Sequence, residues 1–203
     1  MQRILIVYAT TRGWTGRIVD RMAAEFRGMG LHPSVYQAEE AGGLDLDAFD
    51  GVLLAGSVHF GRHQRVLEDF AREHAGDLTL LPSAFLSVCG ALAGSWPGCH
   101  AEAAKHREDF ARRTAWRPEM SWSVAGRIAY TRYPFPLRLV MQFISWRTGR
   151  PTDTSRDWEF TDWLEVERLA HAFGWAVQEV GTREAERPAA GSAGGSTRRL
   201  TTA

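Results

Sequence analysis

The sequence predicts an α/β fold with a doubly wound, five-stranded parallel sheet, and three observations point to this class. Short apolar runs rich in β-branched residues alternate along the chain with segments of helical periodicity. The first of these runs is almost continuously apolar, as expected for a strand that helices cover on both faces. With 203 residues, of which 44% are hydrophobic, the chain is also long enough to enclose a substantial core.

The first unit of the chain predicts a strand at 3–8 and a helix at 16–29. Between them, residues 9–15 supply hydroxyls, a glycine and backbone N–H groups at the start of a helix. Such a turn favours a bound anion, and a phosphate above all. The alternative is an ordinary strand-to-helix turn in which Thr15 caps the helix.

The later elements continue the same alternation. We expect strands at 33–37, 50–57, 82–88 and 122–130, helices at 63–75, 101–114 and 161–178, and a loop or short helix at 38–48. These elements make one domain of about 180 residues. Residues 181–203, which are rich in Gly, Ala, Ser, Thr and Arg, have little to bury and predict a disordered tail.

An unusually long connection, residues 133–157, precedes the last helix. Its centre, from Leu137 to Trp146, predicts a helix that is apolar over most of its circumference, with Arg132 and Arg147 at its margins. Something must cover that surface: the domain's own core, a substrate or a membrane surface. We expect substrate or membrane contact, with the segment not essential to the core.

Composition narrows the function classes. Lys and Arg together number 24, as do Asp and Glu, so the net charge of zero disfavours a nucleic-acid partner and a small acidic electron carrier. Cys89 and Cys99 form no C-x-x-C motif, which favours a reducing, cytoplasmic location. The pair Cys99-His100 with His106 lacks the spacing of metal ligands, so no metal site is expected.

Ligands of open parallel sheets bind beyond the carboxyl ends of the strands, where segments 10–15, 57–63 and 87–93 should converge. The first segment suits a phosphate, and the small residues of the third let a flat ring approach the backbone. Together they predict flavin mononucleotide (FMN). The predicted cofactor-binding residues are Thr10, Thr11, Arg12, Gly13, Trp14, Thr15, Ser57, Val58, His59, Phe60, Ser87, Val88, Cys89, Gly90, Ala91 and Leu92.

The first loop resembles the flavodoxin phosphate loop, Thr/Ser-x-Thr-Gly-x-Thr, at Thr10, Gly13 and Thr15, whereas Arg12 and Trp14 are less usual there. Later segments resemble, in order and spacing, the flavodoxin-like, menaquinone-dependent protoporphyrinogen oxidases. These segments are 56–63, 82–88, 116–118, 130–133, 152–154 and 161–163. The resemblance covers residues 3–175, including the long connection, where 134–136 departs from the family pattern.

This resemblance implies oxidation of protoporphyrinogen IX to protoporphyrin IX in haem biosynthesis, with electrons passing through FMN to menaquinone. It places Arg132, with Tyr130 and Arg138, at the substrate's carboxylates, and the protein on the inner face of the cell membrane as a peripheral enzyme. No catalytic acid or base is identified. The alternatives are another flavodoxin-fold quinone reductase, a flavodoxin-type electron carrier and a non-enzymatic binding module.

Overall fold

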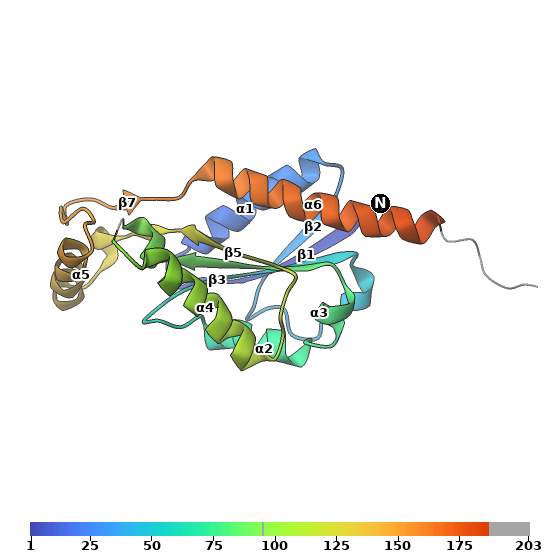
Figure 1. Ribbon diagram of the computed structural model, residues 1–203, viewed down its shortest axis with the longest axis horizontal. Coiled ribbons are helices and arrows are strands. Elements are labelled where there is room, and N and C mark those ends of the chain that lie inside the picture. Colours follow the sequence, from blue (N-terminus) through green and yellow to red (C-terminus); the bar gives the residue numbers. More distant parts are fainter. Residues whose placement is uncertain (95, 187–203) are drawn as a thin grey trace, which may run out of the picture.

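A five-stranded parallel sheet forms the centre of the computed structural model, which describes residues 1–94 and 96–186 (Figure 1). Its spatial order is β2-β1-β3-β4-β5, the order of the flavodoxin-like class of doubly wound folds. The predicted fold class is therefore confirmed. The strands are β1 (Arg3–Ala9), β2 (His32–Gln37), β3 (Gly51–Ser57), β4 (Ser83–Cys89) and β5 (Met120–Ala125).

Helices cover both faces of the sheet (Figure 1). On one face lie α1 (Trp14–Gly28) and α6 (Trp163–Glu186); on the other lie α2 (Arg65–Glu73), the short α3 (Asp77–Leu80) and α4 (Cys99–Thr114). Successive β1 side chains enter opposite cores: Ile4 packs with α1 and α6, and Leu5 with the α2 and α4 side. Single-turn helices are η1 (Leu46–Ala48), η2 (Gly90–Ala93) and η3 (Tyr130–Arg132).

The predicted strand at 122–130 is wrong in its second half. Strand β5 ends at Ala125, and after Gly126 the chain leaves the sheet to form β6 (Arg127–Ile128). This short strand pairs antiparallel with β7 (Trp158–Glu159), which begins 30 residues after β6 ends. The Thr161 hydroxyl donates to the Ala125 carbonyl oxygen at 2.8 Å and so holds the turning point in place.

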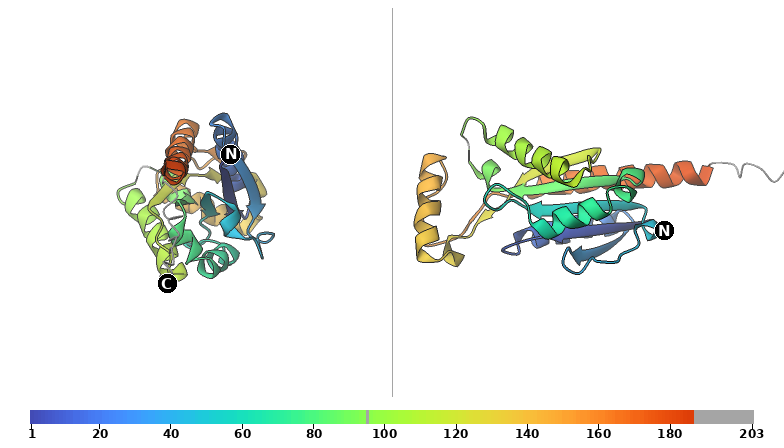
Figure 2. Two further views of the ribbon diagram at one scale, coloured as in Figure 1. Left: turned by 90° about the vertical axis from the view of Figure 1, so that its right-hand side faces the viewer. Right: turned by 90° about the horizontal axis from the view of Figure 1, so that it is seen from below.

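Helix α5 (Phe135–Arg147) stands beyond the carboxyl ends of the strands and runs across that end of the sheet (Figure 2). It is held from beneath by Tyr130, whose fully buried hydroxyl lies 2.5 Å from the Ser145 hydroxyl and 3.0 Å from the Pro151 carbonyl oxygen. Tyr130 belongs to a small buried cluster with Ala93, Ile128 and Tyr133, and Leu137 and Met141 of α5 pack on it. This cluster is separate from the two cores of the sheet.

The outer face of α5 remains apolar and exposed. The exposed fractions of Phe135, Leu139, Phe143 and Trp146 are 71%, 50%, 60% and 68%. The alternative interpretation of the sequence required the domain's own core to cover this helix. The core does not cover its outer face. Across residues 1–94 and 96–186, no helix combines the length and the apolar character needed to traverse a bilayer.

The expected start of the tail at residue 181 is also wrong, because α6 continues to Glu186. At residue 181 the helix packs closely on the start of the chain: a Cβ added to Gly181 would lie 2.1 Å from Gln2 Nε2. The same Gln2 amide donates to the Val177 carbonyl oxygen at 2.8 Å. The remainder of the predicted tail, 187–203, lies outside the described residues.

Candidate functional site

A cavity of about 280 Å³ lies beyond the carboxyl ends of β1, β3 and β4, near the lower end of the roughly 300–1,000 Å³ range of small-molecule sites. Its floor comes from the loops that follow these strands, and α5 with its flanking residues supplies the opposite wall. The lining residues are Thr10, Arg12, Trp14, Thr15, Ser57, Val58, His59, Phe60, Val88, Cys89, Gly90, Ala93, Gly126, Arg127, Ile128, Tyr133, Leu137, Val140, Met141, Ile144 and Arg150.

One end of the cavity meets the N-terminus of α1. Gly13 precedes this helix with a φ of +78°, and no side chain caps it. Thr15 is not the cap: its hydroxyl is buried and has no hydrogen-bond partner among the described residues. A buried hydroxyl without a partner is costly, and the N–H groups of a first helical turn attract anions. This end of the cavity therefore suits a phosphate.

Arg12 joins three segments at the cavity. Its Nη1 lies 2.9 Å from His59 Nε2, and its guanidinium lies over the Tyr133 ring, 4.5 Å from the centroid. Burial, reinforced by the Arg12 charge, lowers the pKa of His59. The neutral imidazole can then accept the Arg12 N–H, and this hydrogen bond joins the β1 loop to the β3 loop. The contact of Arg12 with Tyr133 joins the β1 loop to the long connection.

The β3 loop presents Phe60 at the tip of a tight turn. His59 and Arg62 exchange two backbone hydrogen bonds, of 2.8 and 3.0 Å. Phe60 and Gly61 both have positive φ, +48° and +76°, which is the geometry of a type I′ turn. Left-handed backbone costs a non-glycine residue about 1–2 kcal/mol. The turn nevertheless holds the Phe60 ring, 92% exposed, beside the cavity.

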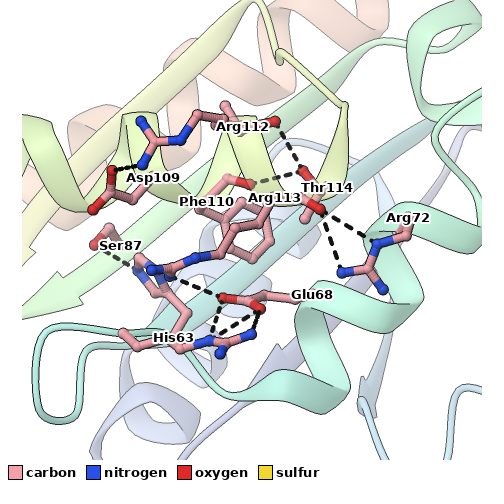
Figure 3. A network of polar contacts seen from close by, with 11 residues as sticks. His63, Glu68, Arg72, Ser87, Asp109, Phe110, Arg112, Arg113 and Thr114 are labelled. Carbon is pink, nitrogen blue, oxygen red and sulfur yellow. Dashed lines mark hydrogen bonds and ion pairs between the residues drawn. The ribbon is translucent and has the colours of Figure 1, made fainter.

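A buried carboxylate anchors this turn from below (Figure 3). Glu68 on α2 is fully buried, and both of its oxygens accept from Arg62 Nε, at 3.1 and 3.2 Å. Arg113 of α4 donates to the same carboxylate at 3.3 Å, and its carbonyl oxygen in turn accepts from Arg72. The Glu68 carboxylate thus links the β3 loop, α2 and α4.

Next to this anchor, His63 is buried and packs edge-on against the stacked rings of Phe85 and Phe110. Its Nε2 lies 2.9 Å from the Ser87 hydroxyl (Figure 3). Burial, together with the charges of His106 and Arg113, lowers the pKa of His63 to about 3. His63 is therefore neutral at pH 7, and Ser87 directs its hydroxyl to His63 and does not line the cavity.

Arginines are the charged residues of the cavity lining, and the described lining includes neither Asp nor Glu. Arg127 lies over the Trp14 ring, 4.7 Å from its centroid, and 3.6 Å from an Asp157 oxygen. Arg150 has a buried Nε without a hydrogen-bond partner among the described residues. Sequence reasoning missed Arg150, because nothing in its neighbourhood distinguishes it from a solvated surface arginine.

The structure brings most of the predicted cofactor-binding residues together around the cavity. Those that do not line it are Thr11, Gly13, Ser87, Ala91 and Leu92. Thr11 accepts a hydrogen bond from the Gln64 amide, which also donates to Ser57.

The predicted substrate residues do not line the cavity, and their role in substrate binding stays a prediction. Arg132 is exposed, Tyr130 is buried beneath α5, and Arg138 donates to the Tyr133 carbonyl oxygen at 3.3 Å. None of the three lines the cavity.

Comparisons with known proteins agree with this geometry. The family model of flavodoxin domains matches residues 5–155. The chain is 27% identical over 168 residues to the protoporphyrinogen IX dehydrogenase (quinone) of Escherichia coli strain K12, covering 83% of this chain and 92% of that protein. It is 29% identical over 172 residues to the protein of the same name from Leishmania major, covering 84% and 74%.

Among solved structures, two-electron reduced Megasphaera elsdenii flavodoxin superposes with a TM-score of 0.50 at 15% identity, covering 85% of this chain and 98% of that one. At that identity the likeness concerns the fold alone.

Replacing Glu68 by Gln should destabilise the protein by about 1.5–3 kcal/mol, because a buried carboxylate that accepts hydrogen bonds from two arginines becomes a neutral amide. Urea unfolding measures this loss. Asp69→Asn is the matched control: Asp69 is the next residue and pairs with Arg65 and Arg72, but its side chain is 51% exposed. The control should cost about 0.2–1 kcal/mol. Equal losses in the two variants would contradict the anchoring role.

Stability should also depend on His63 in acid. The unfolded chain takes up a proton on His63 near its ordinary pKa of 6.5, whereas the folded chain resists it down to about 3. The free energy of unfolding therefore falls as the pH falls from 6.5 toward 3. Over that window wild type should lose about 1.4 kcal/mol per pH unit more than His63→Gln. Parallel stability curves for the two proteins would refute this assignment.

Proposed function

Because this chain belongs to the flavodoxin domain family, we propose that it binds FMN and oxidises protoporphyrinogen IX to protoporphyrin IX with a quinone as electron acceptor. Menaquinone and a place in haem biosynthesis are the finer parts of the proposal. The observation that carries it is the cavity itself. The N-terminus of α1, which suits a phosphate, lies at one end of an otherwise mainly apolar cavity, and α5 forms the opposite wall.

The residues present fit FMN. The unpartnered Thr15 hydroxyl and the first-turn N–H groups of α1 would hold the phosphate. The backbone at Val88–Gly90, where small side chains line the cavity, leaves room for a flat ring. When bound, FMN would supply two-electron chemistry that protein side chains lack, and three such transfers, each to one quinone, would remove the six electrons and six protons by which the porphyrinogen and the porphyrin differ.

The remaining lining fits a large, apolar, anionic substrate. Leu137, Met141 and Ile144 of α5 present an aliphatic wall that would exclude water from the reacting ring system. Protoporphyrinogen IX carries two propionates on such an apolar macrocycle. Arginines without a facing carboxylate in the lining would attract those propionates, whereas acidic residues would repel them.

The test is to supply protoporphyrinogen IX and a soluble naphthoquinone anaerobically and to follow porphyrin fluorescence. Wild type should form porphyrin in an FMN-dependent reaction. Thr15→Val preserves the side-chain shape but removes the hydroxyl. Because a hydrogen bond to a charged group contributes about 1.5–3 kcal/mol, the variant should bind FMN about ten- to a hundredfold more weakly.

Riboflavin, which lacks the phosphate, is the control ligand: its affinity should be nearly the same in wild type and Thr15→Val. Equal FMN affinities would place the phosphate elsewhere. Quinone reduction from another donor, with no porphyrin formed, would favour a different flavodoxin-fold quinone reductase. Bound FMN with neither activity would favour an electron carrier.

We further propose that the outer face of α5 rests on the inner surface of the cell membrane, where a quinone resides. Its exposed apolar side chains are flanked by Arg138 and Arg147, a composition suited to an anionic lipid surface. With 13 residues the helix has the dimensions of an interfacial element. This contact would keep the cavity mouth close to the membrane.

Phe143→Ser combined with Trp146→Ser should lower binding to phosphatidylglycerol-containing vesicles by at least about tenfold, because burying each such side chain contributes about 1.5–3 kcal/mol. Vesicle sedimentation measures the change. Leu164→Ser with Trp175→Ser on α6 is the matched control, since those side chains are 62% and 63% exposed. If both double variants bind vesicles as wild type does, α5 is not the membrane contact.

A further inference from the structure

We infer that Arg150 is the residue that binds a substrate carboxylate inside the cavity, and that it selects for substrates bearing such a group. This inference rests on the proposed function and goes one step deeper, because it names the contact that would recognise an acidic macrocycle. It also moves that role from Arg132, which lies outside the cavity, to a residue of the same long connection that lines it.

The position of Arg150 is fixed by backbone and by small residues. Its N–H donates to the Ser145 carbonyl oxygen at 2.8 Å, which ties it to the end of α5. Its side chain crosses the loop after β4: a Cβ added to Gly94 would lie 3.1 Å from Arg150 Nε, and one added to Gly90 would lie 3.9 Å from Nη1. Glycines at these two positions give the guanidinium its place at the cavity wall.

The charge of Arg150 is not neutralised within the described part of the chain. None of the ion pairs found there involves it, and its buried Nε–H has no acceptor. Burial lowers the pKa of the Arg150 guanidinium, and the charge of Glu102 acts in the opposite direction and raises it. An anionic ligand is what this site lacks.

The other two arginines of the lining already have partners. Arg12 contacts His59 and Tyr133, and Arg127 contacts Asp157 and Trp14. Arg127 thus has a carboxylate partner and the Arg12 guanidinium has two neutral ones, whereas no hydrogen bond or ion pair engages the Arg150 guanidinium within the described residues. A guanidinium can donate two parallel N–H groups to one carboxylate, and such pairs are strong and directional.

The cofactor's phosphate is the other anion that could reach this cavity, but the observations favour the substrate. The features that suit a phosphate, Thr15 and the N-terminus of α1, follow β1, whereas Arg150 lies over the loop that follows β4. Strand β3 separates β1 from β4 in the sheet. The two anion-seeking groups therefore belong to different strand ends of the same cavity.

The experiment compares protoporphyrinogen IX with its dimethyl ester, which keeps the macrocycle but lacks both charges. Arg150→Gln should raise KM for the diacid about ten- to a hundredfold, with a much smaller effect on KM for the ester. Arg150→Lys, which keeps the charge but loses the fork, should fall between the two. Arg156→Gln, an exposed arginine six residues later in the same long connection, is the matched control and should resemble wild type.

Equilibrium binding of the product, protoporphyrin IX, to the FMN-loaded protein gives a readout apart from turnover. Wild type should bind the diacid more tightly than the diester, and Arg150→Gln should lose that preference. An unchanged preference in a folded variant would overturn the inference. So would a weaker affinity of Arg150→Gln for FMN with unchanged affinity for riboflavin, because Arg150 would then serve the cofactor's phosphate.

Failure of the proposed function is recognised separately. If wild type binds FMN but does not oxidise the porphyrinogen, the binding comparison still decides whether Arg150 recognises the diacid. Wild type that binds neither porphyrin would overturn the inference together with the proposed substrate. If Arg150→Gln does not fold, Arg150→Lys carries the same comparison, and equal diacid preference in it and wild type would argue against the two-point contact.

Discussion

Parallel pairing imposes the main constraint on this molecule, because it delivers every strand's carboxyl end to the same edge of the sheet. The loops after β1, β3 and β4 meet there, and α1 turns its N-terminus toward the same place. The spatial order reverses between β1 and β3, which leaves a crevice at that edge. The long connection closes the crevice from outside, so local loop chemistry and overall topology build one site.

Rigidity at this edge depends on a few buried polar groups. Glu68 and its arginines support the turn that carries Phe60, and that support offsets a backbone conformation unfavourable for phenylalanine. His63 and Ser87 satisfy one another under the adjacent strand. The floor of the cavity is thus held by fixed contacts, whereas the exposed groups around it, such as Phe60 and the outer face of α5, remain available to ligands and surfaces.

The sequence predicted what depends on local pattern. Buried strands appear as apolar runs, and the hydroxyl loop before α1 is recognisable because its neighbours are local. The bend at Gly126 escaped prediction, because the strand-like pattern continues through 127–128 into another sheet. In the sequence Glu68 resembles any surface glutamate on an amphipathic helix. Its burial and its contact with Arg113 of α4 depend on the tertiary structure. The place of Arg150 at the cavity could not be predicted either, because it depends on the contact of its side chain with Gly90 and Gly94 in a loop distant in the sequence.

The attachment of α5 has a consequence for how the molecule opens. Its apolar support, around Ile128, Tyr130 and Tyr133, is a cluster distinct from the two cores of the sheet. Cooperative units with separate cores unfold with separate free energies, and the smaller unit opens more often. The free energy that holds this wall of the cavity in place therefore comes from this small cluster and not from the two cores of the sheet.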